Sequence, residues 1–173
     1  MNNKFGMKGY VVIRLFDADR NLKSYQKVEN LITTAGDEYY AKRSAAGVLP
    51  AANADVTKVT GMKLGTGTTL PSKSGAGAAL VVYKTGSNTA FTATYPTVEA
   101  VGGDTGWKVT YYGIWAPGTA TSTTLSEAVI VNDSAADATS VAANTISRVT
   151  FTPINKTAAD TLEISWSHTF LGA

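Results

Sequence analysis

The single histidine is the residue most able to carry acid–base chemistry in this chain. His168 is the only histidine in 173 residues, so a nucleophile–base arrangement would have to use it. It stands between Trp166 and Phe170 in an alternating segment, and we expect a hydrogen-bonded histidine buried between sheets. Three carboxylates that could be paired for sugar hydrolysis show no distinguishing spacing, namely Glu99, Asp104 and Glu127. The sequence therefore predicts no enzyme and no catalytic residues.

Residues 67–74 partly match a phosphate-binding loop. Ser72 stands where the motif needs its last glycine, and Pro71 lacks a backbone donor. The following glycines and alanines are a poor start for the helix that the motif requires. We therefore predict no cofactor and interpret residues 65–79 as a flexible surface loop too poor in large side chains to pack against a core.

Residues 17–21 partly match a calcium-binding loop. Asp17, Asp19 and Asn21 occupy the first three ligand positions, but Leu22 and Val28 replace the glycine and the acidic residue that the motif needs later. Because Asp and Asn also favour hairpin turns, we predict a turn and no metal site.

Three aromatic residues share one side of a predicted strand: Trp107, Tyr111 and Trp115. Such a stripe either lies in the core or contacts sugar rings or a protein partner, and the sequence favours the core.

Composition excludes several classes of function. Cysteine is absent, which excludes disulfides and thiolate metal sites. The net charge of +2 has no basic cluster, so we expect no nucleic-acid partner. No stretch approaches the ~20 apolar residues of a membrane helix, and the N-terminus lacks the apolar segment of a secretory signal. Charged residues are only 16% of the chain, against about 25% in ordinary soluble domains, which suits packing against neighbouring subunits.

Alternating apolar and polar residues predict a mainly β chain. The expected strands are 9–16, 22–29, 59–64, 90–99, 107–115, 123–131, 145–152 and 161–170. The first two form an N-terminal hairpin, and one short helix is expected over 35–46, with Thr34 as its cap and Asp37 in its first turn. Residues 1–173 are thus predicted to form a single antiparallel β-sandwich, either jelly-roll or immunoglobulin-like.

Five phrases of the sequence together resemble virion structural proteins of tailed phages. They are VENLITTAG (28–36), GMKLGTGTTLP (61–71), LSEAVIV (125–131), SRVTFTPINKT (147–157) and DTLEISW (160–166). In that group an N-terminal hairpin and helix precede a glycine–threonine loop and a C-terminal β-sandwich. The resemblance implies a place on the capsid or on the tail and carries no catalytic residues.

The resemblance leads to an expected function as a capsid decoration (cement) protein. Without a repetitive shaft the chain suits a compact subunit bound outside the head better than a fibre. The expected partners are the major capsid protein and copies of the chain in a homo-oligomer such as a trimer, made in the host bacterial cytoplasm and located in the virion. The alternative is a tail or fibre-associated protein, with the aromatic stripe binding glycans. Residues 1–8 are a candidate docking arm through Lys4, Phe5 and Met7.

Overall fold

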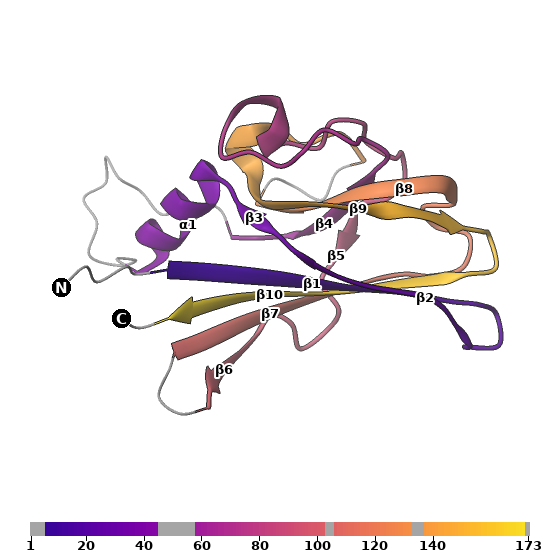
Figure 1. The fold of residues 1–173 in the computed structure, drawn as a ribbon, viewed down its shortest axis with the longest axis horizontal. Helices are drawn as coiled ribbons and strands as arrows, with labels where there is room; N and C mark the ends of the chain where they lie inside the picture. Colours follow the sequence, from indigo (N-terminus) through magenta and orange to yellow (C-terminus); the bar gives the residue numbers. More distant parts are fainter. Residues whose placement is uncertain (1–5, 45–57, 103–105, 133–136, 172–173) are drawn as a thin grey trace.

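The chain folds into two facing antiparallel sheets of five strands each, which confirms the predicted β-sandwich with its N-terminal hairpin and short helix (Figure 1). The computed structural model describes residues 6–44, 58–102, 106–132 and 137–171. Sheet A contains, in spatial order, β2 (Leu22–Glu29), β1 (Gly6–Phe16), β10 (Thr161–Leu171), β7 (Gly106–Trp115) and β6 (Thr97–Val101). Sheet B contains β3 (Leu31–Ile32), β9 (Thr145–Lys156), β8 (Ser122–Val131), β4 (Gly61–Gly65) and β5 (Thr89–Ala90).

The core lies between the sheets and follows from the period of two along each strand. Ile13 on β1 pairs with Ile164 on β10, and both side chains are fully buried against sheet B. Alternate residues of the two strands complete this inner face: Val11, Leu15, Leu162 and Trp166. Sheet B contributes Leu64, Leu125, Ala128, Ile130 and Val149. The clean alternation predicted for 161–170 is confirmed, because the opposite face of β10 is half-exposed apart from Glu163.

Helix α1 (Thr34–Ser44) closes one end of the sandwich, where it packs against β9 and β3 (Figure 1). Its cap is Thr33, one residue earlier than predicted, because the buried Thr33 hydroxyl accepts the Gly36 N–H at 3.0 Å. Gly36 is needed there, since a Cβ atom at this position would lie 2.1 Å from the Ile146 carbonyl oxygen. The predicted end of the helix at Ala46 lies outside the described residues.

One side chain joins the edges of the two sheets. The Gln26 amide donates to the Thr152 carbonyl at 2.9 Å, and its oxygen accepts the Thr152 N–H at 3.0 Å. The amide of Gln26 thereby takes the place of a paired strand residue beside β9, and it satisfies backbone groups that would otherwise be open at this edge.

Two strand boundaries differ from the prediction. The single strand expected over 90–99 is two strands, β5 in sheet B and β6 in sheet A, separated by a turn in which Thr92 accepts the Tyr95 N–H. Pro96 cannot continue a paired ladder, so the chain changes sheets there. Conversely, β9 runs through Pro153 to Lys156, because its pairing with β8 is irregular between Leu125 and Glu127.

Two short 3₁₀ helices complete the described structure. They are η2 (Gly75–Ala78) and η3 (Ala142–Asn144). The first belongs to the long segment between β4 and β5, which passes over the outer face of sheet B (Figure 1). Both faces of sheet B are therefore covered, one by sheet A and the other by this segment, and the last seven residues of β8 are all buried.

Candidate functional site

A buried ion pair on the outer face of sheet B holds a surface loop in place. Glu127 on β8 and Arg148 on β9 are both fully buried, and their charged atoms lie 2.8 Å apart. Residues 66–82, which we call the anchored loop, lie over the pair. An isolated buried charge is costly, so every charged atom of such a pair needs a partner.

Besides its two contacts with Arg148, Glu127 binds the backbone of the anchored loop. Its carboxylate accepts the N–H groups of Gly67 at 2.9 Å, Val81 at 3.1 Å and Val82 at 2.8 Å. The two ends of the loop therefore converge on one side chain. Gly67 fits there because a Cβ atom at this position would lie 2.5 Å from a Glu127 carboxylate oxygen.

Arg148 binds the middle of the same loop. Besides its two contacts with Glu127, its guanidinium donates to the Thr69 carbonyl at 2.7 Å and to the Gly77 carbonyl at 3.1 Å. A planar guanidinium offers its donors in a fixed geometry, so these bonds fix the path of the loop as well as its position. The expectation that residues 65–79 cannot pack is wrong, since Gly77 and Ala78 are buried.

The anchored loop is also tied to helix α1. Lys73 forms an ion pair with Asp37 in the first turn of the helix at 2.6 Å, and its carbonyl accepts the Thr34 N–H at 2.9 Å. Both ions are about half exposed, so this contact adds little stability and mainly sets the position of the loop tip.

The anchored loop presents large apolar side chains to solvent. Leu70 is 77% exposed, and Val81 and Val82 are 40% and 48% exposed. Under the loop, Leu80 packs with Val129 and Val131 in a small second core. A loop that fixes its backbone with a buried ion pair and still exposes leucine is suited to contact another surface.

Sequence reasoning did not find this site. Glu127 appeared as one of three undistinguished carboxylates, and Arg148 appeared only within a phrase of the resemblance. The available signal was one acidic residue and one basic residue in the interiors of two consecutive apolar strands, where an unpaired charge is unfavourable. Of the other two carboxylates, Glu99 forms an exposed ion pair with Lys108, and Asp104 lies outside the described residues.

His168 lies in a buried network of uncharged groups, as the sequence predicts for an inter-sheet histidine. Its Nε2 atom accepts the Trp166 indole N–H at 3.1 Å. Because indole can only donate, we assign the ring proton to Nδ1, which donates to the Tyr40 hydroxyl at 2.5 Å. Tyr40 then donates to Tyr111 at 3.0 Å, and Asn30 completes the network on the Nε2 side.

The network is held in its neutral form by burial. Burial lowers the pKa of His168 to about 3 and raises the pKa of Tyr111 to about 12. The pKa of Tyr40 is also raised well above its usual value by burial. At neutral pH the imidazole therefore carries no charge and both of its nitrogen atoms are engaged, so His168 acts as a hydrogen-bonding group of the core.

Acid is expected to destabilise the protein through His168. Between pH 6.5 and about 3 the unfolded chain binds a proton that the folded chain excludes, so stability falls as pH falls, by up to about 1.4 kcal/mol per pH unit. Urea titrations at pH 7.5, 6.5, 5.5 and 4.5 measure this slope. His168→Gln, which cannot titrate, serves as the control and should flatten it. An equal slope in the variant would assign the acid sensitivity to carboxylates.

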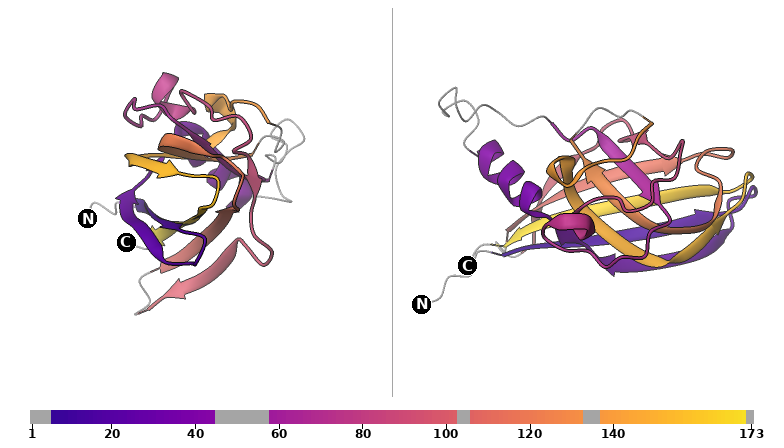
Figure 2. Two further views of the ribbon diagram at one scale, coloured as in Figure 1. Left: turned by 90° about the vertical axis from the view of Figure 1, so that its right-hand side faces the viewer. Right: turned by 90° about the horizontal axis from the view of Figure 1, so that it is seen from above.

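The predicted aromatic stripe is divided between core and surface. Tyr111 and Trp115 are 3% and 2% exposed, and the Trp115 indole donates to the Ser87 carbonyl at 2.6 Å. Trp107 is 58% exposed at the start of β7, opposite Ala100 of β6, and Val98 of the same β6 strand is 62% exposed. Figure 2 shows β6 and this part of β7 extending away from sheet B. The stripe is thus not a continuous sugar-binding surface.

The described part of the predicted docking arm is a strand. Met7 lies in β1, opposite Phe170 of β10, and is half-buried. Lys8 continues the same strand opposite Thr169. An arm that begins to pair at Gly6 cannot include these residues as free contacts. Lys4 and Phe5 lie outside the described residues.

Residues 17–21 form the predicted turn. The Asp17 carboxylate accepts the N–H groups of Asp19 at 2.9 Å and Asn21 at 2.8 Å, and Arg20 adopts a positive φ of 66°. The hydrogen bonds from Asn21 lower the pKa of Asp17. Throughout the described ranges, no three His, Asp or Glu side chains come close enough together to hold a metal ion.

No protein-family model, curated protein or solved structure matches this chain significantly. Among the described residues, no helix has the length and apolar character needed to cross a membrane. The fold and the site together define the class of this protein. It is an antiparallel β-sandwich that carries a surface loop fixed by a buried ion pair.

Proposed function

We propose that this chain is a phage capsid decoration protein that binds the outside of the assembled head and bridges subunits of the major capsid protein. The observation that carries the proposal is the anchored loop, which exposes Leu70 on a backbone fixed by Glu127 and Arg148. The resemblance to virion proteins stated above includes the first part of this loop.

A fixed loop suits docking on a repetitive surface. A loop that is already ordered loses less conformational entropy on binding than a mobile one. Exposed leucine and valine supply apolar contact area without a desolvated charge. Copies of the chain in a homo-oligomer such as a trimer would present several loops at once, so that modest single contacts add through multivalency. A subunit that binds only the assembled shell stabilises that shell by its binding free energy.

The remaining described sites support a structural role rather than catalysis. The only histidine is neutral and fully engaged in the core, and the buried carboxylate of Glu127 binds backbone groups and Arg148. A general base needs access to a substrate, which neither group has.

Leu70→Asp is expected to weaken binding to decoration-free capsids by at least about tenfold, because it places a charge on the apolar docking surface. Co-sedimentation measures the binding, and the melting temperature of the capsids measures the stabilisation. The matched control is Leu22→Asp, at the start of β2, where the leucine is 54% exposed and belongs to neither sheet B nor the loop.

The two variants separate the outcomes. Loss of capsid binding in Leu70→Asp with retention in Leu22→Asp supports docking through the anchored loop. Equal binding by both variants would contradict that docking mode. If the wild-type protein does not bind capsids and instead remains on isolated tails, the alternative of a tail or fibre-associated protein replaces the proposal.

A further inference from the structure

The outer face of sheet A is hollowed along its central strand. On β10 the outward side chains are Ser165, Ser167 and Thr169, all small and half-exposed. The register places larger side chains beside them: Tyr10 of β1 opposite Ser167, and Tyr112 of β7 opposite Ser165. A row of small residues between rows of larger ones leaves a trough that runs along β10 for about 13 Å.

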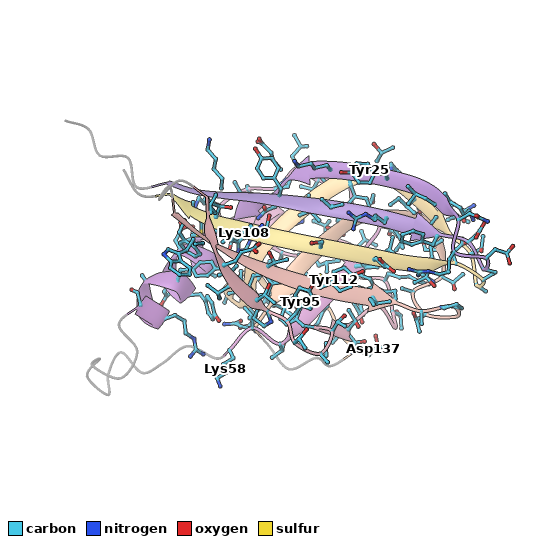
Figure 3. The ribbon with its side chains drawn as sticks, turned by 90° about the horizontal axis from the view of Figure 1, so that it is seen from below. Tyr25, Lys58, Tyr95, Lys108, Tyr112 and Asp137 are labelled. Atoms are coloured by element: carbon cyan, nitrogen blue, oxygen red, sulfur yellow. The ribbon has the colours of Figure 1, made fainter. Side chains whose placement is uncertain are left out.

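The trough is an open depression of about 500 Å³, a volume in the range of ligand-binding sites. Its floor consists of hydroxyl side chains, and rings and charged groups form its walls. The floor residues are Thr97, Thr110, Ser165, Ser167 and Thr169, and the wall residues are Tyr10, Val12, Lys27, Tyr95, Glu99 and Lys108. Figure 3 shows Tyr95 beside Tyr112, with Lys108 further along the same side of the face.

The floor hydroxyls are available for a ligand. Ser167 donates to the Tyr10 carbonyl at 3.2 Å. Within the described part of the chain, the hydroxyls of the other four floor residues form no hydrogen bond with another protein group: Thr97, Thr110, Ser165 and Thr169. Each hydroxyl can donate one hydrogen bond and accept two, so the floor offers a dense row of donors and acceptors.

Two tyrosines give the walls apolar faces. Tyr10 is 36% exposed, and Lys27 lies 4.9 Å from the centre of its ring. Tyr95 is packed against Tyr112, with ring centres 5.3 Å apart, which holds its orientation. A ring held in this way can pack on a flat apolar surface with little loss of side-chain entropy.

We propose that this trough binds an extended carbohydrate chain. Sugars present hydroxyl groups around their rims and C–H groups on their faces, which match the floor and the tyrosine walls respectively. This site is independent of the anchored loop, which lies over sheet B on the opposite side of the sandwich. The protein thereby has a second binding surface beyond the one proposed for capsid docking.

The chemistry of the trough disfavours a peptide or a nucleic acid. An extended peptide binds a sheet by pairing with the backbone of an edge strand, but β10 is the central strand and pairs with β1 and β7 on its two sides. A nucleic acid needs a groove rich in basic residues, whereas the trough is lined by two lysines, Lys27 over the Tyr10 ring and Lys108 paired with Glu99 at 2.5 Å. Carbohydrate is the ligand class that best uses a row of hydroxyl groups between aromatic rings without backbone pairing.

The probe for this proposal is an array of bacterial surface oligosaccharides of three or more sugar units, neutral and anionic, followed by titration calorimetry on the sugars that bind. Tyr10→Ala and Tyr95→Ala each remove a wall, and each is expected to weaken binding by about tenfold or more. Ser165→Arg fills the floor and should abolish binding. Circular dichroism confirms that each variant is folded.

Tyr25→Ala is the matched control, because Tyr25 is an exposed tyrosine of the same sheet, 53% exposed, at the β2 edge away from Tyr95 (Figure 3). Loss of binding in the trough variants with retention in Tyr25→Ala supports the proposal. Binding that survives in Ser165→Arg, or no binding by the wild-type protein to any sugar of the array, overturns it. Capsid binding by Leu70→Asp is measured separately, so either proposal can fail without the other.

Discussion

Glu127→Ala is expected to lower the free energy of unfolding by about 3–5 kcal/mol, the cost typical of removing one partner from a buried ion pair. The substitution leaves the fully buried Arg148 guanidinium without its counter-ion and removes the acceptor of three loop N–H groups. Urea unfolding followed by circular dichroism measures the loss. The same substitution should release the anchored loop. Faster hydrogen exchange at the amides of Gly67, Val81 and Val82 would report this release.

Two further variants define how this ion pair acts. Replacing the exposed Glu99, which pairs with Lys108 on the surface, should cost about 1 kcal/mol or less. The double variant Glu127→Leu with Arg148→Met removes both charges, so it should recover part of the stability while the loop stays unanchored. A Glu127→Ala protein as stable as the wild type, with unchanged exchange in the loop, would contradict the role assigned to the pair.

Trp115→Ala is expected to lower the free energy of unfolding by about 3–5 kcal/mol, whereas Trp107→Ala should change it by about 0.5 kcal/mol or less. Trp115 is 2% exposed in the core and Trp107 is 58% exposed, although they share one strand and one side of it. Trp115→Ala opens a large cavity and leaves the Ser87 carbonyl without its indole donor. Urea midpoints from far-UV circular dichroism compare the two.

This pair of variants also tests how the aromatic stripe is divided. If both substitutions lower the free energy of unfolding equally, the two tryptophans have similar environments. That result would contradict the assignment of Trp107 to the surface. If only Trp107→Ala weakens association with other proteins, the exposed end of β7 belongs to an interface as well.

Local pattern was sufficient to predict most strands. Residues 161–170 alternate without interruption, and β10 follows them to within one residue. The sequence pattern predicted the wrong strand boundaries where a local signal and a long-range contact favour different structures. The strand predicted over 145–152 ends just before Pro153, but the irregular pairing of β8 and β9 lets the strand continue to Lys156. Pro96 was available as a break signal within 90–99, yet the change of sheet depends on what β6 pairs with.

Two buried charges in consecutive apolar strands were a signal for the ion pair, but the complete site could not be predicted, because it depends on the register of two strands and on a loop distant in sequence. Glu127 lies opposite Thr150 rather than Arg148, and the two side chains meet diagonally across β8 and β9. The sequence of the anchored loop predicts a flexible segment, because its glycines and threonines show no periodic pattern of apolar residues. The loop is ordered because its backbone carbonyl and N–H groups form hydrogen bonds with two charged side chains, Glu127 and Arg148. Every sequence has such backbone groups. Hydrogen bonds to the backbone therefore cannot be predicted from the composition of the loop.

The pairing of β1 with β10 brings the two ends of the described chain together, with Gly6 directly opposite Leu171 (Figure 1). In a chain trimmed to residues 6–171, segments fused to the two ends would therefore start from one corner of the molecule, beside α1. A short linker between them would convert the chain into a ring without altering any strand, and peptides displayed from either end would project from the same corner.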